Sequence, residues 1–188
     1  MSSLLIRTLL GMEIILSCSI LSAQEPVKPA TPSVSFPGNS RAVSPDGRYV
    51  IVDVDSLSEP YHTVFLTDLQ FNTRRKLFNY DRNIDVLWSP DSKLLAVTDY
   101  GDSNFSRCSV ISVDEKIAVI SVLDQLFRSL SDSDRKRLER LQNNHHFYIA
   151  ASAWTGTEEL RLRVWGNGDA DPKGFTRYYT VLIHPGQP

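Results

Sequence analysis

Residues 41–122 alternate apolar and polar positions over short runs, which is the pattern of half-buried β-strands. The first run, 48–55 (RYVIVDVD), is followed after a turn by 62–69 (HTVFLTDL), which is rich in β-branched and aromatic residues. The later runs are 75–80, 83–88, 93–100, 107–113 and 116–122. Short strands at regular spacing, with turns between them, predict an all-β, mainly antiparallel fold for the body of the chain, 41–188.

A helical pattern interrupts the strands at about 122–143. Val122, Leu126 and Leu130 follow helical spacing, and Ser131 with Asp134 three residues later resembles a capping box that opens a second helix. The predicted second helix carries basic residues among acidic ones, and the basic candidates for binding are Arg135, Arg137 and Arg140. Mixed charge on a helix is typical of a solvated face, and the alternative is a docking hairpin for an acidic partner.

A turn sequence occurs twice, 45 residues apart. Its first copy is Ser44-Pro45-Asp46-Gly47, and its second is Ser89-Pro90-Asp91 preceded by Trp88. Proline presets the backbone for a tight turn, aspartate caps it, and glycine permits a positive φ. Four strands fit between the two copies, which is the spacing of propeller blades.

The second copy, 88–97 (WSPDSKLLAV), resembles the WD40-like β-propeller repeat of exported bacterial proteins, as in TolB and the prolyl oligopeptidase group. The first copy has Val43 where Trp88 stands, and a degenerate third copy at 154–160 keeps Trp154 without the proline and aspartate. The resemblance implies a partial β-propeller of about three four-stranded blades with a helical insertion. It implies little about function, because propellers host many activities.

Three blades are fewer than the four to eight that usually close a propeller. We therefore expect two terminal sheet faces that are apolar and in need of cover. The helical insertion could cap an open arc, two chains could complete a ring as a homodimer, or the sheets could rearrange into a compact body. We favour the covered arc.

The N-terminal segment reads as a targeting signal. Residues 1–23 combine Arg7, an apolar run and a small residue, Ala23, before a cleavage point, as in a secretory signal peptide. Residues 24–40 are proline-rich and predict a linker. Cys18 lies in a stretch that loosely resembles a lipobox, so lipidation there is the alternative to cleavage. The prediction is an exported protein, periplasmic or extracellular, with a membrane role only through this signal or a lipid anchor.

Composition and missing motifs narrow the function. Lysine and arginine total 20 against 22 acidic residues, for a net charge of -2, which argues against a dedicated nucleic-acid binder. We find no nucleophile elbow, phosphate loop, dinucleotide fingerprint or zinc-binding helix, and we expect no cofactor. The leading hypothesis is a non-catalytic binding or scaffold module with a protein partner. The alternatives are an enzyme with a cryptic site, such as His145 with Asp169, and a structural envelope lipoprotein tethered through Cys18.

Aromatic and acidic residues supply the remaining candidates. Trp88, Trp154 and Trp165 are expected to pack between sheets. A possible binding cluster comprises Tyr148, Tyr178 and Tyr179. Three acidic groups sit near turns, namely Asp53 with Asp55 and Glu59, Asp99 with Asp102, and Asn167 with Asp169 and Asp171. Turn chemistry accounts for all three, although calcium in the 166–174 loop stays open.

Overall fold

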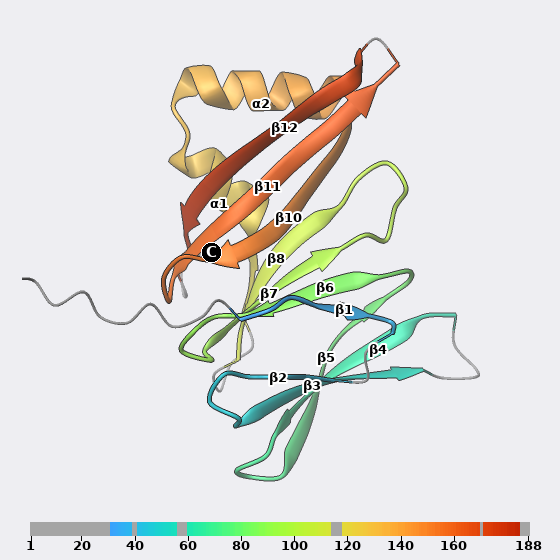
Figure 1. The fold of residues 1–188 in the computed structure, drawn as a ribbon, viewed down its shortest axis with the longest axis vertical. Helices are drawn as coiled ribbons and strands as arrows, with labels where there is room; N and C mark the ends of the chain where they lie inside the picture. The colour runs from blue at the N-terminus through green and yellow to red at the C-terminus, as the bar shows by residue number, and fades with distance from the viewer. Residues whose placement is uncertain (1–30, 39–40, 56–59, 114–117, 170, 185–188) are drawn as a thin grey trace, which may run out of the picture.

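The computed structural model describes residues 31–38, 41–55, 60–113, 118–169 and 171–184. The predicted signal peptide, Cys18 and Glu59 lie outside these residues. In this part of the chain, twelve strands form three antiparallel sheets that follow one another along the molecule, and two helices lie beside the third sheet (Figure 1). The predicted all-β, mainly antiparallel and partly propeller-like fold is confirmed.

Each sheet is built from strands that are consecutive in sequence, apart from one addition. The first sheet is β2(Arg41–Val43), β3(Tyr49–Asp55), β4(His62–Asp68) and β5(Thr73–Tyr80). The second sheet has the order β1(Val34–Phe36), β6(Ile84–Trp88), β7(Leu94–Asp99), β8(Arg107–Ser112) and β9(Ala118–Ser121). The third sheet is β10(His146–Trp154), β11(Glu159–Gly168) and β12(Asp171–Leu182).

Side-chain capping explains why the first repeated turn forms between β2 and β3. The Ser44 hydroxyl donates to Asp46 Oδ1 at 2.6 Å and accepts the Tyr49 backbone N–H at 2.9 Å. The second turn, between β6 and β7, repeats both bonds with the residues 45 positions later, Ser89, Asp91 and Leu94. The two copies therefore occupy equivalent places in their sheets, as the sequence repeat predicts.

The backbone conformation is repeated as well. Gly47 has a φ of 76°, and Ser92, at the equivalent position, has a φ of 66° in the same left-handed region. The third turn lacks this chemistry. It is closed by the backbone bond from Thr155 N–H to the Glu159 carbonyl at 2.9 Å, so the third copy is a simpler turn between β10 and β11.

Two tryptophans join successive sheets in the same way. Trp88, at the end of β6, directs its indole N–H to the Ala42 carbonyl of the first sheet, with an N–O distance of 3.5 Å. Trp154, at the end of β10, donates to the Leu87 carbonyl of the second sheet at 3.0 Å. Because Ala42 and Leu87 hold equivalent positions, Trp154 marks a true third repeat. Burial of Trp88 and Trp154 between sheets confirms that part of the prediction.

Two apolar cores lie on either side of the second sheet. The core shared with the first sheet includes Ile51, Leu66, Trp88 and Leu95. The core shared with the third sheet includes Leu94, Ala96, Leu160 and Leu162. Adjacent residues of β7 thus face opposite cores, as expected for a strand buried on both sides.

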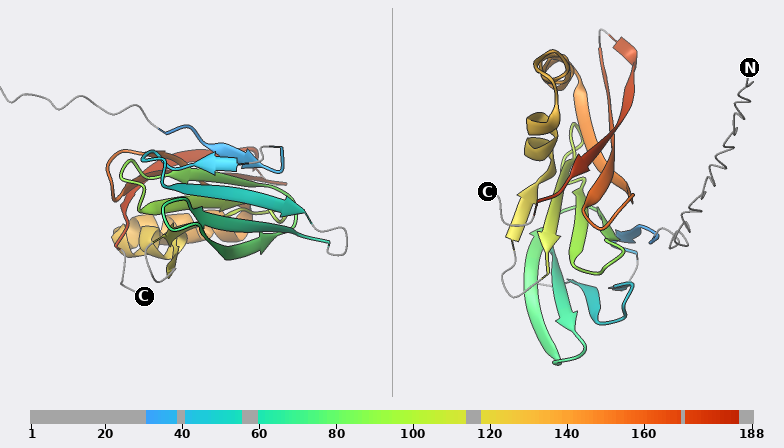
Figure 2. Two further views of the ribbon diagram at one scale, coloured as in Figure 1. Left: turned by 90° about the horizontal axis from the view of Figure 1, so that it is seen from below. Right: turned by 90° about the vertical axis from the view of Figure 1, so that its left-hand side faces the viewer.

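The predicted helical insertion forms α1(Val122–Ser129) and α2(Asp132–Asn144). Ser131 caps α2 and accepts the Asp134 N–H at 3.2 Å, which confirms the predicted start of the second helix. Leu126 and Leu138 belong to the core between the second and third sheets. Figure 2 shows the helices lying along one side of β10–β12. They fill the gap between two sheets instead of capping a terminal face, which differs from the favoured expectation.

The strand count also differs from three sheets of four. The third sheet has three strands, and the helices occupy the wedge beside it. The second sheet gains β1, which lies within the stretch predicted as linker and pairs with β6 through Val34–Val86 and Phe36–Ile84. Phe36 is fully buried in the core between the first and second sheets. Burial of this apolar side chain stabilises the pairing of the short strand β1 with β6.

Candidate functional site

The strongest candidate for a contact surface is the face of the third sheet that points away from the helices, which we call the open face. Register places Tyr148 beside Trp165, and Arg163 beside Tyr178, on the same side of the sheet. Arg161 lies two residues before Arg163 and therefore on that side as well. The side chain of Tyr178 is exposed, at 56%.

The open face is organised by stacked rings and guanidinium groups. The Tyr148 and Trp165 rings stack with centroids 5.3 Å apart and an interplanar angle of 18°. Arg163 lies 4.6 Å from the Trp165 centroid, and Arg161 lies 5.0 Å from that of Tyr178. Neither arginine forms an ion pair with a carboxylate among the described residues. These contacts hold two cationic groups over aromatic rings while leaving their charge available.

Two predictions about aromatic residues need correction here. Trp165 does not pack between sheets, because its odd position in β11 places it on the open face, opposite the buried Leu162 and Val164. Tyr179 does not join Tyr148 and Tyr178, because it follows Tyr178 directly and so points to the opposite face. There it packs against the core that contains the helices, and burial raises the pKa of its phenol.

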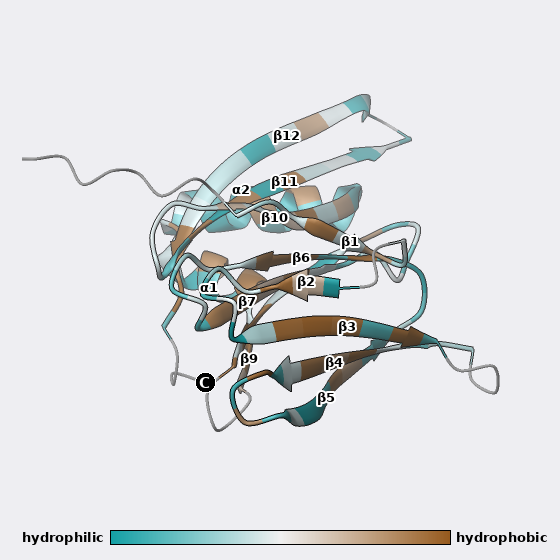
Figure 3. Ribbon diagram, turned by 60° about the horizontal axis from the view of Figure 1, so that its bottom comes forward, coloured by the Kyte–Doolittle hydropathy of each residue, from teal (hydrophilic) through white to brown (hydrophobic). Residues whose placement is uncertain are grey.

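The outer face of the first sheet has a different character. Val43 and Val54 are exposed there, and Figure 3 colours much of β3 as hydrophobic. Phe65 shares this face and is covered by the Arg74 guanidinium, 4.1 Å from its ring centroid. The two terminal faces are therefore not equally apolar, since only that of the first sheet matches the expectation from sequence.

The arginines of α2 do not converge on the open face. Arg137 and Arg140 are exposed, and Arg135 approaches Asp132 one turn earlier at 4.0 Å. The helix thus presents a charged, solvated surface on the other side of the third sheet from Tyr148 and Tyr178.

His145 makes a different pairing from the one considered for a cryptic enzyme. Its Nδ1 lies 3.1 Å from the Leu141 carbonyl, and its Nε2 lies 3.5 Å from Asp171 Oδ2, so its acidic neighbour is Asp171 and not Asp169. Asp171 Oδ1 also accepts the Gly174 N–H. No third metal-ligating side chain joins this pair within the described part of the chain.

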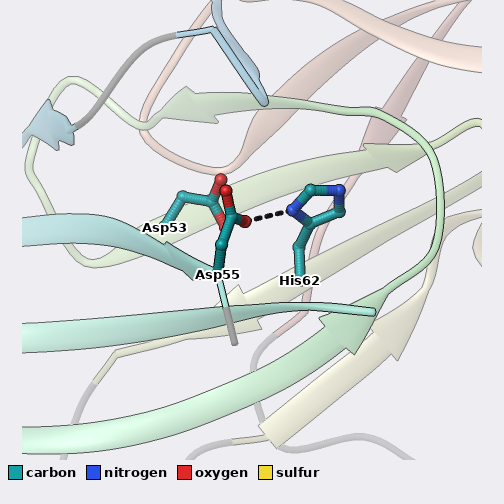
Figure 4. Close-up of side chains that lie close together, drawn as sticks. All are labelled: Asp53, Asp55 and His62. Carbon is teal, nitrogen blue, oxygen red and sulfur yellow. Dashed lines mark hydrogen bonds and ion pairs between the residues drawn. The ribbon is translucent and has the colours of Figure 1, made fainter. Parts of the chain in front are cut away.

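The remaining acidic residues either cap turns or form one cluster with a histidine. Asp99 and Asp102 accept the backbone N–H groups two residues later, which is turn capping. Asp53 and Asp55 instead lie close to His62 (Figure 4). Cys108 is buried, and burial raises the pKa of its thiol to about 12. A thiolate nucleophile at this position is therefore disfavoured.

No protein-family model and no curated protein matches this sequence. Among solved structures, the chain is similar to one from a structural and mechanistic analysis of two prolyl endopeptidases. The two share 12% identity with a TM-score of 0.41, and the match covers 82% of this chain and 21% of the other. This chain thus corresponds to about a fifth of that protein's length. Within the described residues, neither helix is long and apolar enough to span a membrane.

Proposed function

We propose that this chain is a non-catalytic binding module that recognises an acidic protein surface through the open face of its third sheet. The observation that carries the proposal is the set of stacked rings on an exposed sheet face with two arginines that pair with no carboxylate of the described residues. Tyrosine, tryptophan and arginine are the residues most enriched at the energetic centres of protein interfaces. Their rings offer rigid apolar area, and Arg161 and Arg163 supply the charge that favours acidic partners.

The charges on the two terminal faces favour a different protein, and not a second copy of this chain, as the partner that binds the open face. In a ring of two chains, the open face would meet the outer face of the partner's first sheet. That outer face, although apolar around Val43 and Val54, carries Arg74 and Lys76 beside Phe65, so basic residues would lie on both sides of the contact. Like charges across an interface oppose association.

A photo-crosslinking experiment tests the proposal. With benzoylphenylalanine in place of Tyr178 and the chain expressed in its native host, we expect a discrete adduct with another protein. The double substitution Arg161→Glu and Arg163→Glu should abolish that adduct. The matched control, Arg137→Glu with Arg140→Glu on α2, should leave it unchanged.

Three results would contradict the proposal. An adduct of twice the chain's mass would identify a homodimer. An adduct lost only with the α2 substitutions would assign binding to the helix. An adduct that survives charge reversal of Arg161 and Arg163 would remove their proposed role.

We further propose that the chain acts outside the cytoplasm, at the cell envelope or in the secreted fraction. The support is the signal-like sequence of residues 1–23. Intact-mass measurement of membrane and soluble fractions distinguishes a chain that starts at Gln24 from one that starts at a lipidated Cys18. An uncleaved chain found in the cytoplasm would refute export.

A further inference from the structure

One cluster of metal-ligand side chains lies at the end of the first sheet, far along the chain from the open face. Asp55 is directly opposite His62 in the β3–β4 pair, and Asp53 precedes Asp55 by two residues. All three side chains are therefore on one face of the hairpin. One ligand atom from each lies within 4.8 Å of the others, and His62 Nδ1 contacts Asp55 Oδ1 (Figure 4).

A buried hydroxyl beside the cluster gives a second, independent observation. Tyr80 lies opposite His62 on β5, and its ring stacks on the imidazole with centroids 4.8 Å apart. The residue is only 3% exposed, and its Oη makes no hydrogen bond within the described part of the chain. Asp53 Oδ1 is also buried without a hydrogen-bond partner there.

The Tyr80 hydroxyl lies near the Asp53 carboxylate. Asp53 lies on β3 and Tyr80 on β5, so β4 separates them. The hydroxyl is nevertheless close enough to interact with the Asp53 carboxylate across that strand. A buried polar atom without a partner carries a desolvation cost, and a cation bound by the Asp53 carboxylate would offset that cost for Asp53 Oδ1.

The negative charge of the cluster also favours a bound cation. Asp53 and Asp55 place two carboxylates close together, and no lysine or arginine in the described part of the chain forms an ion pair with either. Among the described residues, His62 is the one cationic candidate in contact with them, and one imidazole cannot balance two carboxylates. A bound cation would offset their repulsion and give Asp53 Oδ1 a partner.

We propose that Asp53, Asp55 and His62 bind one divalent transition-metal ion, such as Zn²⁺, with water at its other positions. An imidazole nitrogen with carboxylate oxygens suits zinc, whereas calcium and magnesium favour all-oxygen sites. Tyr80 is placed to hold a ligating carboxylate in position, the role that outer hydrogen-bond donors have around metal ligands. The ion would tie β3 to β4 where β3 ends and β4 begins.

Isothermal titration of the purified, tag-free chain with Zn²⁺ tests the proposal. We expect one ion per chain with a dissociation constant of about 10 μM or lower. Each of the substitutions Asp53→Asn, Asp55→Asn and His62→Gln should weaken binding at least about tenfold. Asp171→Asn is the matched control, because it removes the carboxylate of the other His–Asp pair and should leave the affinity unchanged.

A second readout separates metal binding from a folding defect. Cobalt substituted at a site with nitrogen and oxygen ligands gives visible absorption, which should disappear in His62→Gln while far-UV circular dichroism shows an intact fold. The proposal is overturned if the parent chain does not bind Zn²⁺ at about 0.1 mM. It is also overturned if the three cluster variants keep the parent affinity, or if Ca²⁺ binds more tightly than Zn²⁺.

Discussion

The joint between the first and second sheets and the joint between the second and third use the same tryptophan contact in different surroundings. Trp88 and Trp154 each reach back to an equivalent backbone carbonyl of the preceding sheet. At the first joint, the sheets pack directly on each other, and the Asp46 N–H donates to Ser92 Oγ from one repeated turn to the next. At the second joint, α1 and α2 share the core with the two sheets.

This difference shows which parts of the repeat the fold requires. The indole contact and the apolar layer persist in the third unit, although the proline, aspartate and fourth strand are gone. A helical pair supplies the apolar area that the missing strand would have contributed. Local turn chemistry is thus replaceable here, and coverage of the buried sheet face is not.

Removing either indole should produce the largest loss of stability. Trp88→Ala and Trp154→Ala should each lower the free energy of unfolding by about 3–5 kcal/mol, because each deletes a large buried side chain at a joint. Urea unfolding followed by far-UV circular dichroism measures this without depending on tryptophan fluorescence. A loss below about 1 kcal/mol for Trp154→Ala would show that the third sheet is not packed as described.

Substitution by phenylalanine sharpens the comparison. Trp154→Phe removes a 3.0 Å hydrogen bond, whereas Trp88→Phe removes a 3.5 Å contact at the limit of such bonds. We expect Trp154→Phe to cost about 1 kcal/mol more than Trp88→Phe. Equal costs would mean that the indole N–H contributes little at either joint.

Leu138 of α2 is 1% exposed, and its substitution tests how much the helices stabilise the packing between the second and third sheets. Leu138→Ala should lower the free energy of unfolding by about 2–4 kcal/mol, since it opens a cavity between α2 and the third sheet. Leu69→Ala, at an exposed leucine in the turn after β4, is the control and should change it by less than about 0.5 kcal/mol. If the two losses are similar, the helices do not hold the sheets together.

The sequence was sufficient for features that local chemistry specifies. The repeated turns, the all-β class and the N-cap at Ser131 follow from residues close together in the chain. Trp154 alone was enough to indicate the third repeat, because its indole performs the same contact as that of Trp88.

Features that depend on register were harder to predict. Trp165 and Tyr179 were placed on the wrong sides because a shift of one residue in a strand reverses the face. Strand β1 was missed because Val34 and Phe36 lie in a proline-rich stretch, and only pairing with β6 makes them a strand. The pairing of Asp55 with His62 also needs the hairpin register, although Asp–x–Asp at a strand end with histidine opening the next strand was a usable signal.

The repeated turns should give a smaller and equal effect at both copies. Ser89→Ala should cost about 1–2 kcal/mol, because it leaves the Leu94 N–H without its side-chain acceptor at a fully buried position. Ser44→Ala should cost about the same, since it removes the equivalent bond to Tyr49. Thr155→Ala in the exposed third turn is the control and should be nearly neutral. A clearly larger loss of unfolding free energy for Thr155→Ala than for Ser89→Ala would contradict the stabilising role assigned to the serine side chains of the repeated turns.

The smallest effect concerns an ion pair that only the first repeat has. Arg48 Nη2 lies 2.8 Å from Asp68 Oδ2, whereas Lys93 and Ser112 hold the equivalent positions in the second repeat. The Arg48 guanidinium lowers the pKa of Asp68 in the folded chain. The stabilisation is therefore present above the ordinary aspartate pKa of about 4, and it is lost as the pH falls through the lowered folded value.

Urea midpoints of the parent chain at pH 6 and at pH 3 give the reference drop in stability, and Asp68→Asn should make this drop smaller. The asparagine oxygen can still accept the Gln70 N–H, so the turn itself is kept and the charge is what changes. Arg48→Gln removes the other partner of the same pair and should reduce the drop similarly. If Asp68→Asn reduces it and Arg48→Gln does not, the pH dependence comes from the turn around Asp68, and the ion pair would no longer distinguish the first repeat from the second.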